Sequence, residues 1–202
     1  MKGKLSHFSP EITAAELRTA GRLTLATHNA GKVQELRAAL AATGLAVTGA
    51  ENLAAPEEGH DSFEANALLK ARFAAAALGT WALADDSGLC VEALDGAPGV
   101  DTAHFGGWER LLAVLKDVPE PRRARFECVL ALCAPDGRAQ IFRGTCAGVI
   151  TQQAQGDGGF GYDPVFRPEG AAVTFAAMDA AVKQGLSHRG QALRALCDWL
   201  TA

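Results

Sequence analysis

Two adjacent carboxylates are the residues of this sequence best suited to chemistry. They lie in the segment Ala84-Asp85-Asp86-Ser87-Gly88, directly after an apolar run that begins at Trp81. We therefore predict that a buried strand delivers both acids and a hydroxyl into a glycine turn, at a strand end where α/β sites usually form. Adjacent acids repel unless a cation shares them, and Mg²⁺ prefers one or two carboxylate oxygens alongside water and phosphate. The pattern indicates metal-assisted chemistry, and an Asp-rich turn closed by an Asx hydrogen bond is the alternative.

A second segment could bind phosphate, and it consists of Thr27, His28, Asn29, Ala30, Gly31 and Lys32. It lies between a predicted strand and a predicted helix, where backbone N–H groups and the positive end of the helix dipole meet anions. Lys32 adds a point charge. The segment is not a Walker loop, because Ala26 stands where that motif needs its first glycine and Val33 where it needs Ser or Thr. An ordinary Asn-Ala-Gly turn is the alternative.

Two polar pairs could add ligands to such a site. Asn66 and Lys70 lie at i and i+4 of a predicted helix and share one of its faces, where the lysine could hold a phosphate. Glu57 and Glu58 precede that helix in a polar loop and could supply another metal carboxylate. Taken alone, each pair is better explained as a solvated surface.

A glycine-rich segment, residues 156–164, formally contains the pattern G-x-G-x-x-G. A dinucleotide-binding fingerprint must follow a strand and open a helix, whereas Pro164 and a β-like pair follow here, so we reject that interpretation. What remains is a loop that presents Phe160, followed by Gly161, Tyr162 and Asp163. Stacking of Phe160 on a planar base would contribute ~1–3 kcal/mol. A hydrophobic latch against the core is the alternative.

A third cationic segment comprises Lys183 and the run Ser187-His188-Arg189-Gly190 at the start of the last predicted helix. Arginine donates hydrogen bonds and never accepts them, so Arg189 could favour the 6-keto oxygen of a purine and mismatch the 6-amino group of adenine. Simple capping of the helix by Ser187 is the alternative.

The elements that position these segments alternate between strands and helices. Strands are predicted at 23–26 and 81–84, and a helix carries Val33, Leu36 and Leu40 on one face. A second helix should begin near Asp61, which forms a capping-box pattern with Glu64, and end at Gly79. Further predictions are a short helix at 108–115, an antiparallel hairpin of 124–134 with 139–150, and a final helix at 190–200. These elements indicate an α/β fold, a mixed twisted sheet with flanking helices.

The length and composition of the chain indicate one globular domain. The chain has 202 residues, of which 49% are apolar and 21% are charged. We predict an N-terminal extension at 1–21 and a single catalytic domain at 22–202. A net charge of −4 argues against binding to nucleic acid polymers. The five cysteines form no C-x-x-C pair, and no signal peptide or membrane span is recognisable, so a reduced cytoplasmic protein is expected.

In their order along the chain, these segments resemble the inosine/xanthosine triphosphate pyrophosphatase family, which removes deaminated purine nucleotides. The resemblance covers roughly residues 22–200 and rests on ATHNAGK at 26–32, ADDSG at 84–88, GAPGV at 96–100, GGFGYDPVF at 158–166 and SHRGQAL at 187–193. It implies hydrolysis of ITP, dITP and XTP to the monophosphate and pyrophosphate. It also implies Mg²⁺ as cofactor, an elongated two-lobed sheet structure with the site in the cleft, and a homodimer.

The resemblance further implies roles for individual residues. Asp86 would be the general base, and its neighbour Asp85 and Glu57 would join it as magnesium ligands in the same acidic site. Ser87 would touch substrate, and residues 27–32 with Lys70 and Asn66 would hold the triphosphate. Phe160 would stack on the base, and the nucleoside pocket would be completed by Gly161, Tyr162, Asp163, Lys183, His188 and Arg189. How guanine is refused does not follow from the sequence.

The sequence departs from the family pattern in two substituted segments and in the length of one loop. Ala65 stands where the motif Phe-x-Glu-Asn-Ala has glutamate, and Asp101-Thr102-Ala103-His104 replaces the usual Tyr-Ser-Ala-Arg. The loop after Gly106 is also short. These departures motivate one alternative, a nucleotide-binding regulator without catalysis. A pyrophosphatase for other modified nucleotides, such as methylated or pyrimidine triphosphates, is a second alternative.

Overall fold

The computed structural model describes residues 11–50, 53–59 and 62–202, which form a six-stranded sheet in the order β2-β1-β3-β4-β5-β6. The strands are β1 (Arg22–Leu25), β2 (Ala46–Gly49), β3 (Ala82–Val91), β4 (Arg123–Cys133), β5 (Ala139–Ile150) and β6 (Phe166–Pro168). β1 pairs in parallel with β2 and β3, whereas β3 with β4, β4 with β5 and β5 with β6 pair antiparallel. The predicted mixed sheet and its long hairpin are therefore confirmed.

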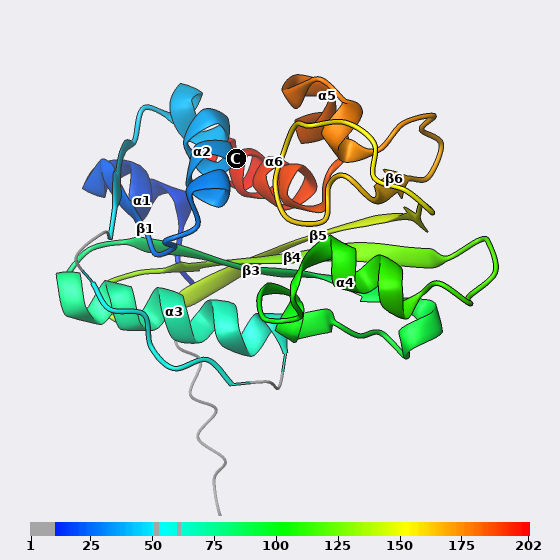
Figure 1. Ribbon diagram of the computed structural model, residues 1–202. Coiled ribbons are helices and arrows are strands. Elements are labelled where there is room, and N and C mark those ends of the chain that lie inside the picture. Colours follow the sequence, from blue (N-terminus) through cyan, green and yellow to red (C-terminus); the bar gives the residue numbers. More distant parts are fainter. Residues whose placement is uncertain (1–10, 51–52, 60–61) are drawn as a thin grey trace, which may run out of the picture.

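Helices cover both faces of this sheet (Figure 1). One face carries α3 (Phe63–Leu78) and α4 (Gly107–Val114), and the other carries α1 (Ala14–Ala20), α2 (Ala30–Leu40), α5 (Ala180–Leu186) and α6 (His188–Thr201). Short 3₁₀ helices occupy Ala41–Thr43, Glu92–Leu94, Gly99–Ala103 and Phe175–Ala177. Because both faces are covered, every residue of β3 except Ser87 is buried. Within the described chain, no helix is long and apolar enough to cross a membrane.

α3 approaches the sheet closely because its inner face consists of alanines, at 67, 71, 74 and 75, which pack against β3 and β4. The helix begins after Ser62, whose Oγ accepts a hydrogen bond from the Ala65 amide at 3.1 Å. Asp61, the predicted cap, lies outside the described residues. The helix ends at Gly79, as predicted, where the backbone adopts the left-handed conformation with a φ of 61°.

The apolar core is divided along the sheet. One cluster, including Leu25, Leu36 and Leu196, lies between the sheet and helices α1, α2 and α6. Another cluster surrounds Phe126 and Phe166 at the far end of the long strands and includes Leu111 of α4. A third cluster, which includes Ala67, Ala71 and Val129, lies between α3 and the sheet.

The described part of the N-terminal extension packs on this core. Ile12 and Leu17 are buried in the first cluster. Thr13 and Glu16 form a capping box at the start of α1, and Arg138 of the β4–β5 turn donates to a Glu16 carboxylate oxygen at 2.9 Å. The hairpin turn therefore holds α1 in place.

The contact between Glu16 and Arg138 should make stability depend on acid pH. Hydrogen bonds from Arg138 and Thr13 lower the pKa of Glu16 from 4.5 to about 2. A depressed carboxylate pKa stabilises the fold above pH 4.5, and that contribution is lost as the pH falls towards 2. We expect Glu16→Gln to lower the melting temperature slightly at pH 7 and not at pH 2. Glu169→Gln, at an exposed site remote from α1, is the matched control, and a pH-independent difference would contradict the assignment.

Candidate active site

The phosphate-loop segment lies between β1 and α2, as the sequence predicts. β1 ends at Leu25, and Asn29 caps α2 by accepting a hydrogen bond from the Lys32 amide at 3.1 Å. The Asn29 amide donates to Thr27 Oγ1 at 3.3 Å, which closes the loop. The first turn of α2 consequently presents backbone N–H groups, with the Lys32 side chain beside them, to whatever lies beyond the end of β1.

The two adjacent carboxylates do not lie in a glycine turn, so that part of the prediction is wrong. β3 continues through Gly88 to Val91, paired with β4 along its whole length. Its pairing with β1 ends at Leu83, opposite Leu25, where β1 turns into the phosphate loop, and the same edge is next contacted by the 3₁₀ helix Gly99–Ala103 through the Leu89 amide. Successive side chains of a strand point to opposite faces. Asp85 accordingly contacts α2 and α6, whereas Asp86 contacts α3.

Asp86 lies beside two donors of α3. Lys70 Nζ donates to its Oδ1 at 2.7 Å and Asn66 Nδ2 to its Oδ2 at 3.3 Å, and Lys70 also donates to Glu58 at 3.1 Å. Burial raises the pKa of Asp86 above its usual value, against the opposing attraction of Lys70. Burial lowers the pKa of Lys70, but attraction to Asp86 and Glu58 outweighs it and the net shift is upward. A carboxylate with a raised pKa is suited to accept a proton.

Asp85 is buried on the opposite face and carries a firmly held negative charge. Its Oδ2 accepts from Arg189 Nε at 2.8 Å and from Cys128 Sγ at 3.2 Å, and its Oδ1 accepts from Ser87 Oγ at 2.9 Å and contacts Lys32 Nζ. Burial raises the pKa of Asp85, but the charges of Arg189 and Lys32 outweigh it and hold the pKa well below its usual value.

Glu35 is a member of this site that the sequence interpretation missed. Its carboxylate accepts from Lys183 Nζ at 2.8 Å and from Arg189 Nη1 at 2.7 Å. It lies one turn after Lys32 on α2, so the i, i+3 spacing could have suggested that the two residues share a face. Lys183 and Arg189, which belong to different helices, are thereby held together.

Phe160 packs against this cationic group. Lys183 Nζ lies 4.7 Å and the Arg189 guanidinium carbon 5.6 Å from the centre of its ring. A Cβ at Gly31 would come within 2.5 Å of a ring carbon of Phe160, so only glycine permits this approach of loop and ring. The predicted base-stacking residue and the predicted phosphate loop are therefore in direct contact.

The neighbours of Phe160 shape its loop. Asp163 accepts from the Phe160 amide at 2.8 Å and from Lys183 at 2.7 Å. Tyr162 is buried in the second core cluster and donates to the Thr102 carbonyl at 3.2 Å, whereas Gly161 is exposed.

His188 is buried next to Arg189. Its ring stacks on Phe126 with the centres 4.6 Å apart, and its Nδ1 has no hydrogen-bond partner among the described residues. Burial, reinforced by the charge of Arg189, holds the pKa of His188 well below its usual value, so the ring is neutral. Ser187 caps α6 by accepting from the Gly190 amide at 3.0 Å. The capping alternative is thus true and coexists with the buried position of Arg189.

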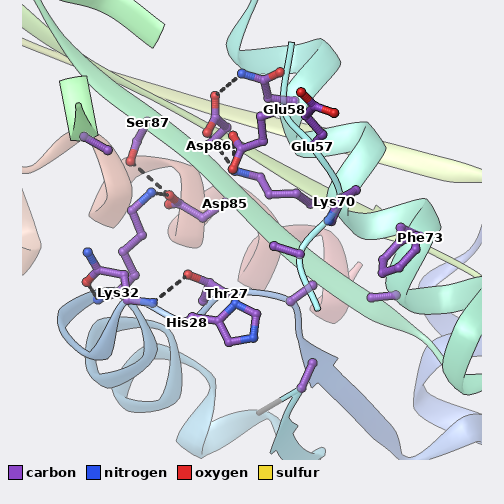
Figure 2. A pocket seen from close by; sticks show the side chains of 18 of the residues that line it. Thr27, His28, Lys32, Glu57, Glu58, Lys70, Phe73, Asp85, Asp86 and Ser87 are labelled. Carbon is purple, nitrogen blue, oxygen red and sulfur yellow. Dashed lines mark hydrogen bonds and ion pairs between the residues drawn. The ribbon is translucent and has the colours of Figure 1, made fainter. Parts of the chain in front are cut away.

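A cavity of about 540 Å³ opens beside these residues, and Figure 2 shows Lys32 directed at Asp85 and Lys70 at Asp86 across it. The predicted site residues that line it are Thr27, His28, Asn29, Lys32, Glu57, Asn66, Lys70, Asp85, Asp86 and Ser87. The loop and helix residues predicted to hold the base, such as Phe160 and Arg189, do not line this cavity. They adjoin it through Asp85, which lines the cavity and contacts Arg189.

A family model described as the Ham1 family matches residues 23–199. The chain belongs to the Ham1 family. It is 45% identical over 185 residues to a dITP/XTP pyrophosphatase of Ruegeria pomeroyi, which covers 85% of this chain and 91% of that protein. It is 48% identical over 184 residues to a dITP/XTP pyrophosphatase of Thermosynechococcus vestitus, with coverages of 87% and 93%.

Solved Ham1 structures share the fold. A HAM1 protein from Coxiella burnetii superposes with a TM-score of 0.82 at 36% identity and covers 89% of this chain and 98% of that chain. The Staphylococcus aureus Ham1 protein superposes with a TM-score of 0.79 at 34% identity and coverages of 89% and 98%. The family resemblance predicted from the sequence is therefore confirmed.

The two departures from the Ham1 pattern lie close to the site. Ala65 is exposed in the first turn of α3, one residue before the Asn66 that donates to Asp86. In the second segment, Thr102 Oγ1 donates to the Gly99 carbonyl at 2.5 Å and accepts from the Leu89 amide at 2.9 Å. Thr102 thereby attaches the altered 3₁₀ helix to β3 at Leu89, three residues beyond Asp86.

Proposed function

We propose that the chain is a magnesium-dependent pyrophosphatase that converts ITP, dITP and XTP into the corresponding monophosphate and pyrophosphate. The observation that carries this function is the pair of acids on opposite faces of β3. Asp86 and Lys70 face the phosphate cavity on one side, and Asp85 contacts the Arg189 and Phe160 group on the other. The names of the Ham1 relatives from Ruegeria pomeroyi and Thermosynechococcus vestitus support the same reaction.

In this mechanism Asp86 accepts the proton of a water molecule that attacks the α-phosphorus. The bond from the water oxygen to that phosphorus forms, and the bond from the same phosphorus to the bridging oxygen breaks, so pyrophosphate leaves intact. Lys70 and Lys32 hold the departing phosphate oxygens together with the N–H groups of residues 29–32. Positioning and charge stabilisation supply most of the rate in such reactions.

The residues present fit a magnesium ion. Asp86, Glu57 and Glu58 offer hard carboxylate oxygens on the wall of one cavity. Mg²⁺ in proteins takes one or two carboxylates and completes its shell with water and phosphate. Asp86 and Glu57 would hold the ion, which when bound would neutralise charge on the phosphate oxygens.

The group around Phe160 would select the base. Phe160 offers a ring face for stacking, and Arg189 offers donors that match a 6-keto oxygen and mismatch a 6-amino group. Lys183 and His188 complete the proposed pocket, and Asp163 fixes the loop that carries Phe160.

The contact of Gly31 with Phe160 yields an expected result for this pocket. Gly31→Ala would push the ring away, so we expect the KM for dITP to rise about tenfold, within the ~1–3 kcal/mol of a base stack. The variant should retain its melting temperature. Gly185→Ala is the matched control, because a Cβ at Gly185 meets nothing within 4 Å. An unchanged KM in Gly31→Ala would contradict the stacking role of Phe160.

Product identity tests the proposed function most directly. The protein should release pyrophosphate and dIMP from dITP in Mg²⁺ and release none in excess EDTA. Comparison of dITP, XTP, dGTP and dTTP separates altered purines from other modified nucleotides. Formation of nucleoside diphosphate with orthophosphate would contradict attack at the α-phosphorus, and absence of turnover with retained binding would indicate a regulator.

Two wider properties belong to the same proposal. A reduced cytoplasmic location is supported by five free cysteines, of which four are buried. A homodimer is supported by the exposed apolar pair Leu69 and Phe73, which lie one turn apart on α3. Light scattering of the purified protein measures the oligomeric state.

A further inference from the structure

Asp85 and Asp86 are adjacent in sequence, but their side chains contact different helices. Asp86 contacts Lys70 and Asn66 of α3, whereas Asp85 contacts Lys32 of α2 and Arg189 of α6. In Figure 2 the two carboxylates point away from each other across β3. A single metal ion shared symmetrically by both carboxylates does not fit this geometry.

The acceptor positions of the Asp85 carboxylate are already occupied by other groups of the protein. A carboxylate has about four acceptor positions, and four groups approach this one: the Lys32 ammonium, the Ser87 hydroxyl, the Arg189 Nε and the Cys128 thiol. The side chain is buried, with 1% of the residue exposed. A metal ion at either oxygen would displace a donor and would lie next to two fixed cations.

The same contacts form a closed ring around the arginine. Arg189 Nε donates to Asp85, Arg189 Nη2 donates to Ser87 Oγ at 2.8 Å, and Ser87 Oγ donates back to Asp85. Arg189 Nη1 is held from the other side by Glu35. Contacts among the described residues thus engage three of the five N–H groups of the guanidinium, and one on each terminal nitrogen is left by them to meet a ligand.

We propose that Asp85 is a positioning residue and not a magnesium ligand: it fixes the guanidinium of Arg189 for the base and the ammonium of Lys32 for the phosphates. The proposal rests on the proposed function and deepens it. Because one buried carboxylate holds both cations, selection of the base and binding of the triphosphate both depend on Asp85. The sequence-based assignment of Asp85 to the metal site is replaced by this role.

The test compares Asp85→Asn with Glu57→Gln, a variant of a proposed metal ligand, in steady-state kinetics. Wild-type protein is first shown to release pyrophosphate from dITP, because failure at that step would overturn the function and not the role of Asp85. For Asp85→Asn we expect the ratio of kcat/KM for dITP to that for dATP to fall at least tenfold, with the Mg²⁺ concentration for half-maximal activity changed less than twofold. Glu57→Gln should show the opposite pattern.

A rise of tenfold or more in the Mg²⁺ requirement of Asp85→Asn, with the dITP to dATP ratio unchanged, would overturn the proposal. Asp95→Asn is the matched control, because Asp95 is exposed and its φ of 51° suits asparagine. It should leave both quantities unchanged.

A second variant covers the case in which Asp85→Asn does not fold. The pair Asp85→Asn with Arg189→Gln removes one charge of each sign from the buried site. In the Arg189→Gln background, adding Asp85→Asn should change the dITP to dATP ratio less than twofold, because the group through which Asp85 acts is already lost. A further tenfold fall would show that Asp85 acts on the base independently of Arg189 and would overturn the proposal.

Discussion

Asp86→Asn is expected to lower kcat for dITP by about 1,000-fold or more, because an amide can neither accept the proton of the attacking water nor supply a carboxylate to the metal. KM should change little, since Lys32, Lys70 and the helix N-terminus still hold the phosphates. Pyrophosphate release at saturating dITP and Mg²⁺ measures the effect. Asp117→Asn is the control, because that side chain is 89% exposed.

The same variant should fold normally. Burial raises the pKa of Asp86, so the folded state disfavours its ionised form, and a neutral amide removes that cost at pH 7. Lys70 keeps Glu58 as a partner at 3.1 Å. We expect a melting temperature equal to or above that of the wild type. Retained turnover would contradict the role of Asp86 as base, and loss of both folding and turnover would contradict the electrostatic argument.

The elements of this fold could be predicted because their signals are local. The apolar periodicity of α2, with Leu36 and Leu40 fully buried, and the turn between β4 and β5 each depend on a few neighbouring residues. The course of β3 could not be predicted in the same way. The polar residues Asp85 to Ser87 interrupt its apolar pattern and imitate a turn, although pairing with β4 keeps the strand extended as far as Val91.

The composition of the candidate site was only partly predictable. Charged residues in loops and at helix starts, such as Lys32 and Arg189, stand out because glycine or short polar residues that begin a helix lie beside them. Glu35 does not stand out, because an acidic residue on an amphipathic helix usually faces solvent. Its contacts with Lys183 and Arg189 arise only when α2, α5 and α6 meet over the sheet. Similarly, nothing near Tyr162 in the sequence shows that its ring enters the core.

Arg189→Met is expected to lower the free energy of unfolding by about 3–5 kcal/mol, the usual cost of removing one partner from a buried ion pair. Arg189 is 2% exposed and forms ion pairs with both Asp85 and Glu35, beside the further pairs of Lys32 with Asp85 and of Lys183 with Glu35. Denaturant unfolding at pH 7 measures the loss. Arg194→Met is the matched control on the same helix, since Arg194 is exposed and should cost less than about 1 kcal/mol.

The sign of the pH dependence identifies the cause of that loss. In the wild type, Arg189 and Lys32 hold the pKa of Asp85 below its usual value. Without Arg189, Lys32 alone opposes the effect of burial, so the pKa of Asp85 should rise from its wild-type position. The destabilisation should therefore be largest at pH 8 and shrink as the pH falls through the raised pKa. Adding Asp85→Asn should restore part of the lost stability at pH 8. If the loss were the same at all pH values, and Asp85→Asn restored nothing, the cost would come from lost packing of the arginine stem, not from an uncompensated buried carboxylate.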